Sequence, residues 1–155
     1  MLAQASSSAL IARAALAASP SAPRVARRHV RHTMTSWGLH QGLVETAVLV
    51  ASELVANAAK AAAGQILLTL CYAGQALRIE VTDASTNPPL LADGPPEAES
   101  GRGMVIVDAL TSEWSYSLLP SGLGKIVYCV LPADCQADDE ADEGPVAEPG
   151  LRAAS

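Results

Sequence analysis

The chain has 155 residues, a length that fits one folded domain with a single hydrophobic core but not two full domains. Half of the residues are hydrophobic and only five are aromatic, so the predicted core is aliphatic. The formal net charge of -6 disfavours a general nucleic-acid binder, because neutralising phosphates requires a basic surface.

Residues 1–22 are rich in Ala and Ser and contain no acidic side chain. They lack the basic start and the continuous apolar stretch of a secretory signal. No run of 18 or more apolar residues occurs in the chain, so no membrane span or membrane partner is predicted. We expect residues 1–22 to form a flexible or partly helical leader, and the protein to be cytoplasmic.

A helix is predicted from Pro23 to Trp37, where the folded domain is expected to begin. Four arginines recur at i, i+3, i+4 and i+7 on one face, while an apolar stripe lines another: Arg24, Arg27, Arg28 and Arg31, against Ala26, Val30, Met34 and Trp37. The basic face could hold an acidic partner or the chain's own acidic tail. A solvated helix face is the favoured interpretation.

A longer helix is predicted from Leu43 to Ala63, with Gly64 as its stop. Two strands follow, at 65–72 and 75–83, joined by a turn at Ala73-Gly74. Apolar and polar residues alternate along the second strand, which indicates a hairpin with one buried face.

Residues 84–100 contain four prolines and no periodic pattern, which predicts a mobile surface loop and a candidate lid. A short helix at 103–110 and two strands at 113–119 and 124–131 complete the predicted domain, which ends at Pro132. The segment 133–155 holds seven acidic residues and one arginine, and we expect it to be a disordered tail.

The three cysteines, Cys71, Cys129 and Cys135, form no C-x-x-C pair, so neither a disulfide framework nor a zinc site is indicated. The first two fall in predicted strands and are interpreted as small buried hydrophobic residues. The order of elements predicts an α+β fold, a two-layer α/β sandwich with helices on one face of a mostly antiparallel sheet.

Three short blocks carry the functional signal: Glu53-Leu-Val-Ala-Asn57, Val81-Thr-Asp83, and Gly101-Arg102-Gly103-Met104. The first places a carboxylate and a carboxamide one helical turn apart, where the amide oxygen can hold Mg²⁺ and the carboxylate can accept a proton. An aspartate that ends a strand suits the amino group of adenine. Glycines at a helix start allow phosphates to approach backbone N–H groups, and Arg102 could add a charge.

Each block alone is weak evidence, since a Glu and an Asn at this spacing are more often an exposed face and a Gly-x-Gly is more often a turn. Together and in this order they resemble the N, G1 and G2 boxes of the histidine-kinase-like ATPase superfamily. The stretch from Pro23 to Pro132 is most similar to its small single-domain branch, the anti-sigma-factor serine/threonine kinases of actinobacterial type.

This resemblance implies a Bergerat-type ATP-binding fold with ATP and Mg²⁺ as cofactors. Carried over, Asn57 holds the metal, Glu53 is the catalytic base, Asp83 reads adenine, and Gly101 and Gly103 wrap the phosphates. The chain departs from the pattern in three ways. Ala61 stands where many relatives have His, Ile126 where many have a Thr that supports the adenine region, and the glycine after the G1 aspartate is missing.

The leading hypothesis is an ATP-binding regulatory protein that phosphorylates a Ser or Thr of a small anti-sigma-factor antagonist and also binds a sigma factor. The alternative is a non-catalytic module that sequesters either partner. An ATPase module of a two-component sensor is disfavoured because no sensor region or phospho-accepting His helix accompanies the blocks. Relatives of this kind often form homodimers.

Overall fold

The computed structural model describes residues 8–89 and 102–133. Within these ranges the chain forms three helices and five strands. In chain order they are β1 Leu10–Ala17, α1 Ala22–Ser36, α2 Gln41–Ala61, β2 Gln65–Ala73, β3 Ala76–Asp83, α3 Arg102–Leu110, β4 Glu113–Leu118 and β5 Lys125–Pro132.

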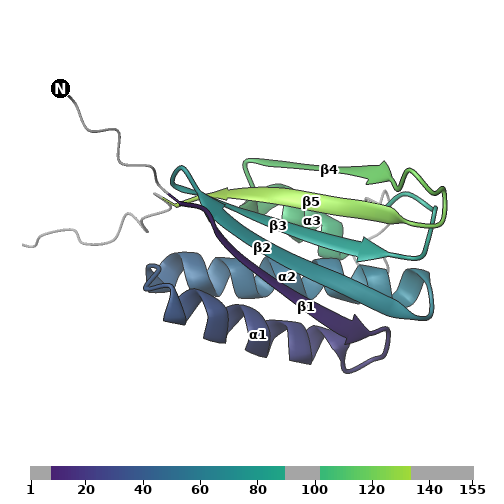
Figure 1. The fold of residues 1–155 in the computed structure, drawn as a ribbon, viewed down its shortest axis with the longest axis horizontal. Coiled ribbons are helices and arrows are strands. Elements are labelled where there is room, and N and C mark those ends of the chain that lie inside the picture. The colour runs from purple at the N-terminus through teal and green to yellow at the C-terminus, as the bar shows by residue number, and fades with distance from the viewer. Residues whose placement is uncertain (1–7, 90–101, 134–155) are drawn as a thin grey trace, which may run out of the picture.

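The five strands form one sheet in the order β1-β2-β3-β5-β4, and every neighbouring pair is antiparallel. Figure 1 shows the helices stacked against one side of this sheet, with α2 lying beneath its central strands and α1 beneath β1. The predicted α+β two-layer sandwich is therefore confirmed. The predicted β2–β3 hairpin is also confirmed, and its turn uses Gly74 and Gln75, both with positive φ, as hairpin turns that match strand twist require.

The core between the two layers is built from aliphatic side chains, as the composition predicted. Alternate residues of β2, β3 and β5 point into it and meet the apolar faces of α1 and α2. Cys129 is fully buried there, and burial raises the pKa of its thiol to about 12. Cys71 is only half-buried, so the interpretation as a buried hydrophobic residue holds fully for Cys129 alone.

The prediction of a flexible or partly helical leader over residues 1–22 is wrong for Leu10–Ala17, which form the edge strand β1. This strand pairs along its whole length with β2, from Leu10 opposite Tyr72 to Ala17 opposite Gln65. Alanine favours helix locally, but pairing with an exposed strand edge and burial of Leu16 override that preference. Residues 1–7 lie outside the described part of the chain.

The arginine face of α1 is partly used within the fold. Arg27 donates a hydrogen bond to Ser52 Oγ at 2.7 Å, and Arg31 pairs with Glu45 at 3.0 Å. Both partners lie on α2, so these two arginines help to join the helices. Arg24 and Arg28 are exposed.

By length and composition alone, α2 could cross a membrane, since it has 21 residues with a mean hydropathy of 1.4 over its most apolar window. That window is 56% buried within the fold. A buried core helix passes the same test, so this is weak evidence for a span.

Two further expectations cannot be compared with the structure. The loop predicted over 84–100 is described only up to Pro89, and the acidic tail after Ala133 lies outside the described residues.

Candidate functional site

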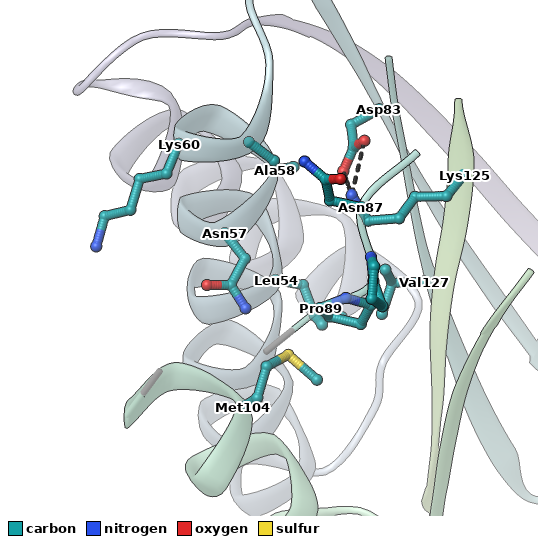
Figure 2. Close-up of a pocket in the computed structure, with 12 residues that line it drawn as sticks. Leu54, Asn57, Ala58, Lys60, Asp83, Asn87, Pro89, Met104, Lys125 and Val127 are labelled. Carbon is teal, nitrogen blue, oxygen red and sulfur yellow. Dashed lines mark hydrogen bonds and ion pairs between the residues drawn. The ribbon is translucent and has the colours of Figure 1, made fainter. Parts of the chain in front are cut away.

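A pocket of about 250 Å³ opens between the helix layer and the sheet, at the end where β3 stops and β5 begins. Its lining comes from five parts of the chain: α2, the end of β3, the segment just after β3, the start of α3 and the start of β5. Figure 2 shows Asp83 and Lys125 joined on the sheet side, and Asn57 and Met104 on the helix side. The second and third sequence blocks therefore meet the first around one cavity.

Asn57 lines this pocket from α2, next to Leu54 and Ala58, which are both buried in the core. Its Nδ2 atom is buried and has no hydrogen-bond partner in the described parts of the chain. Because an unpaired buried donor is costly, it indicates a site that a ligand acceptor would complete. A phosphate oxygen would satisfy this donor, and the amide Oδ1 is the kind of oxygen that Mg²⁺ accepts as a ligand.

Glu53 lies one turn before Asn57 and does not line the pocket itself. It faces the start of α3, where a Cβ placed on Gly103 would lie only 2.6 Å from Glu53 Oε2. Any larger residue at position 103 would displace the carboxylate. Gly103 therefore brings the first and third blocks into contact.

The structure places α3 with its first turn at Arg102 and Gly103, and Met104 from this turn is fully buried at the pocket wall. Unpaired N–H groups at the start of a helix attract anions. Gly101 and the side chain of Arg102 lie outside the described residues, so their predicted roles in phosphate binding stay predictions.

A pair of nested turns orients Asp83 at the end of β3. Its Oδ1 accepts a hydrogen bond from the Ser85 backbone N–H at 2.8 Å, and Ser85 Oγ accepts one from the Asn87 backbone N–H at 3.1 Å. Both Asp83 and Ser85 are buried. The Ser-containing turn thus holds the carboxylate although no glycine follows Asp83 directly.

Lys125 is a site residue that the sequence analysis missed. Its Nζ lies 2.9 Å from both carboxylate oxygens of Asp83, and the two side chains are only 4% and 3% exposed. The two residues are directly opposite in the β3–β5 ladder. The neighbouring Gly124 makes this possible, because a Cβ there would overlap the backbone carbonyl of Asp83.

The expectation that Ile126 occupies the position in the last strand that supports the adenine region is wrong. Ile126 pairs with Thr82 and belongs to the opposite face of the sheet, whereas the adjacent Lys125 lines the pocket. The alternation of side chains along β5 is the sequence signal that could have identified Lys125. Val127, Cys129 and Leu131 face the core, so the same face must also hold residue 125. Ala61, four residues after Asn57 on α2, also lines the pocket.

Comparison with protein families gives a match to the histidine kinase-like ATPase domain over residues 16–130. The chain therefore belongs to this family, and the match begins within β1, before the predicted domain start. The fold and the three convergent blocks agree with this assignment. No curated protein matches the chain.

Among solved structures, the chain is similar to the crystal structure of the RsbU and RsbW domains of Rv1364c from Mycobacterium tuberculosis. The TM-score is 0.61 at 19% identity, and the match covers 79% of this chain. It covers only 32% of that longer chain. The likeness establishes a shared fold.

Proposed function

We propose that the chain is a cytoplasmic, ATP-binding regulator of the anti-sigma-factor type, which transfers phosphate from Mg-ATP to a Ser or Thr of a small antagonist protein. Its partners would be that antagonist, a sigma factor, or both, in a partner-switching system, and a homodimer is one assembly that it could form. Membership of the histidine kinase-like ATPase family supports nucleotide binding. The structural likeness to a chain with an RsbW domain supports the regulatory class.

The observation that carries the proposal is the meeting of the three blocks around one pocket. Asp83 and Asn57 line the cavity from opposite layers, and Gly103 brings the helix start of α3 against Glu53. The cavity is slightly smaller than the roughly 300–1,000 Å³ of most small-molecule sites. The cavity suits a nucleobase, and the phosphates of the nucleotide would lie outside the cavity, toward α2 and α3.

Bound Mg-ATP would supply the phosphoryl group, and its Mg²⁺ would supply the positive charge that neutralises the phosphates. In this arrangement Asn57 would hold the metal through Oδ1, and the N-terminal N–H groups of α3 would face the phosphates. Glu53 Oε2, held beside Gly103, would accept the proton from the attacking hydroxyl of the partner. Lys60, an exposed residue of α2 that lines the pocket, would add a positive charge on the α2 side of the site.

A non-catalytic sequestering module is the second candidate, and two observations favour it. Ala61 provides no polar group at the pocket wall, and Lys125 already occupies one acceptor position on each Asp83 carboxylate oxygen. Such a module would bind a sigma factor or antagonist without transferring phosphate.

Phosphotransfer can be tested by incubating the purified protein with γ-labelled ATP, Mg²⁺ and candidate small antagonist proteins from the same genome. The wild type should label a Ser or Thr of one antagonist. Glu53→Gln should reduce the labelling rate by about a hundredfold or more, as expected for the loss of a general base, while ATP affinity stays within a few-fold. Glu45→Gln is the matched control, because Glu45 is an exposed glutamate of the same helix.

Equal labelling by the wild type and Glu53→Gln would contradict the base assignment. Capture of an antagonist with no labelled product under any condition would favour the sequestering module.

A further inference from the structure

The buried pair formed by Asp83 and Lys125 lines the sheet side of the pocket (Figure 2), and the roles described above do not explain why Asp83 is paired with a lysine. A lysine is rarely buried this completely unless it is paired. Removing two charges from water also gives little net stability compared with an apolar pair of similar size. The pair therefore suggests a use in the pocket beyond holding two strands together.

The hydrogen-bonding capacity of the pair can be counted atom by atom. The Asp83 carboxylate offers about four acceptor positions. Oδ1 accepts from Lys125 Nζ and from the Ser85 N–H, while Oδ2 accepts from Lys125 Nζ alone. An ammonium group has three hydrogens, and Asp83 takes two of them in the described structure. One acceptor on Oδ2 and one donor on Nζ remain, side by side.

Adenine presents a matching pair on its Watson–Crick edge, an amino donor beside the ring acceptor N1. The adenine amino group can donate a hydrogen bond to Asp83 Oδ2 while adenine N1 accepts one from Lys125 Nζ. Both free positions of the Asp83–Lys125 pair then have a partner, and so do the amino group and N1. Guanine could match the same two atoms with O6 and N1–H, but its 2-amino donor beside N1–H would then find no free acceptor on the pair. A buried donor without a partner costs binding free energy, so the counted positions fit adenine better.

We propose that Lys125 is a specificity-determining residue that donates a hydrogen bond to N1 of the adenine base while staying paired with Asp83. This inference rests on the proposed nucleotide-binding function. This role belongs to a residue that lies outside the three sequence blocks and directly opposite Asp83 in the sheet. Because the donor is charged, the bond is stronger than one between neutral groups. The base is then read by a carboxylate and an ammonium together.

The test combines a change in the protein with a change in the ligand. Calorimetry would measure the dissociation constants of ATP and of 1-deaza-ATP, in which a C–H replaces N1, for the wild type and for Lys125→Met. In the wild type, 1-deaza-ATP should bind about tenfold or more weakly than ATP, the range expected for a hydrogen bond to a charged group. In Lys125→Met the two ligands should bind equally. 7-deaza-ATP, which changes an atom that the pair does not contact, is the matched ligand control.

The outcomes separate this inference from the broader proposal. If ATP binds but 1-deaza-ATP binds the wild type equally well, N1 is not read and the role of Lys125 is overturned while nucleotide binding stands. Tighter ATP binding by Lys125→Met would also overturn it, since the lysine would then be competing with the base. If no nucleotide binds the wild type, the proposed function itself fails. The wild-type comparison remains decisive even if Lys125→Met does not fold.

Discussion

Lys125 shows how a single residue can be overlooked in a sequence and yet define a pocket. A lysine that follows a glycine at the start of a strand is usually exposed, and nothing nearby in the chain signals its partner. The carboxylate that pairs with it, Asp83, is 42 residues away and becomes a neighbour only through the β3–β5 ladder. Asp83, Asn57 and Gly103 could be predicted because their spacing within local elements carries information, whereas a cross-strand pair depends on register.

The buried pair makes Asp83 important for the stability of the fold as well as for the proposed nucleotide binding. Asp83→Asn keeps the size of the side chain but leaves the Lys125 ammonium buried without a counter-charge. We expect this variant to lose about 3–5 kcal/mol of unfolding free energy, as measured for other buried ion pairs that lose one partner. Urea unfolding at pH 7, followed by circular dichroism, measures the loss.

The double variant Asp83→Asn/Lys125→Met removes the unpaired charge and should recover most of that stability. Identical urea midpoints for the wild type and Asp83→Asn would contradict the buried pair seen in the structure. Binding experiments on Asp83 variants should therefore be done well below the urea and temperature ranges of unfolding.

His29 provides a separate prediction for pH. Its Nε2 is buried without a partner in the described residues, and burial, with a smaller contribution from His32, lowers its pKa below the ordinary 6.5. The unfolded chain therefore binds a proton at higher pH than the folded chain does. The contribution of neutral His29 to stability is complete above about pH 6.5 and declines as the pH falls below that value.

Urea unfolding at pH 7.5, 6.5 and 5.5 would measure this decline. His29→Gln should flatten the dependence on pH, and His32→Gln should retain most of it, because His32 contributes only the smaller charge effect. An unchanged slope in His29→Gln would assign the pH dependence to other groups.

At the scale of elements, the sequence predicted seven of the eight described elements and missed β1. The helices α1 and α2 have strong periodic apolar stripes, and β2, β3 and β5 alternate clearly between buried and exposed residues. By contrast, half of β1 is alanine and only Leu16 of this strand is buried. Its structure is imposed by the open edge of β2, which a local pattern cannot reveal.

Deleting β1 tests whether it is part of the domain. Removal of residues 1–17 should expose the edge of β2 and uncover Ile66, which is buried in the intact chain and pairs with Leu16 of β1. We expect the melting temperature to fall by about 5 °C or more, since roughly 1 kcal/mol corresponds to several degrees in a domain of this size. Thermal unfolding with light scattering would detect both the lower melting temperature and any aggregation.

Deletion of residues 1–7 alone is the matched control and should leave the melting temperature unchanged. If both truncated chains unfold like the full chain, β1 contributes nothing to the stability of the fold.

At the scale of the whole molecule, the sheet is covered by helices on one face, and the pocket lies between the two layers at one end. This arrangement brings together residues from α2, β3, α3 and β5 that are far apart in the chain. The α+β class and the meeting of the three blocks followed from the order of elements and from the family resemblance. The size of the pocket and the pairing inside it did not, because both depend on how the layers pack.

The central claim is that this pocket binds Mg-ATP. Calorimetric titration of ATP into the full chain, with Mg²⁺ and with a chelator, tests it most directly alongside Asn57→Ala and the exposed α2 control Gln41→Ala. We predict Mg²⁺-dependent binding by the wild type and Gln41→Ala, weakened about tenfold or more in Asn57→Ala, as expected when a metal ligand and a buried donor are lost together. No binding at millimolar ATP, or equal binding by Asn57→Ala and the wild type, would contradict the assignment of the site.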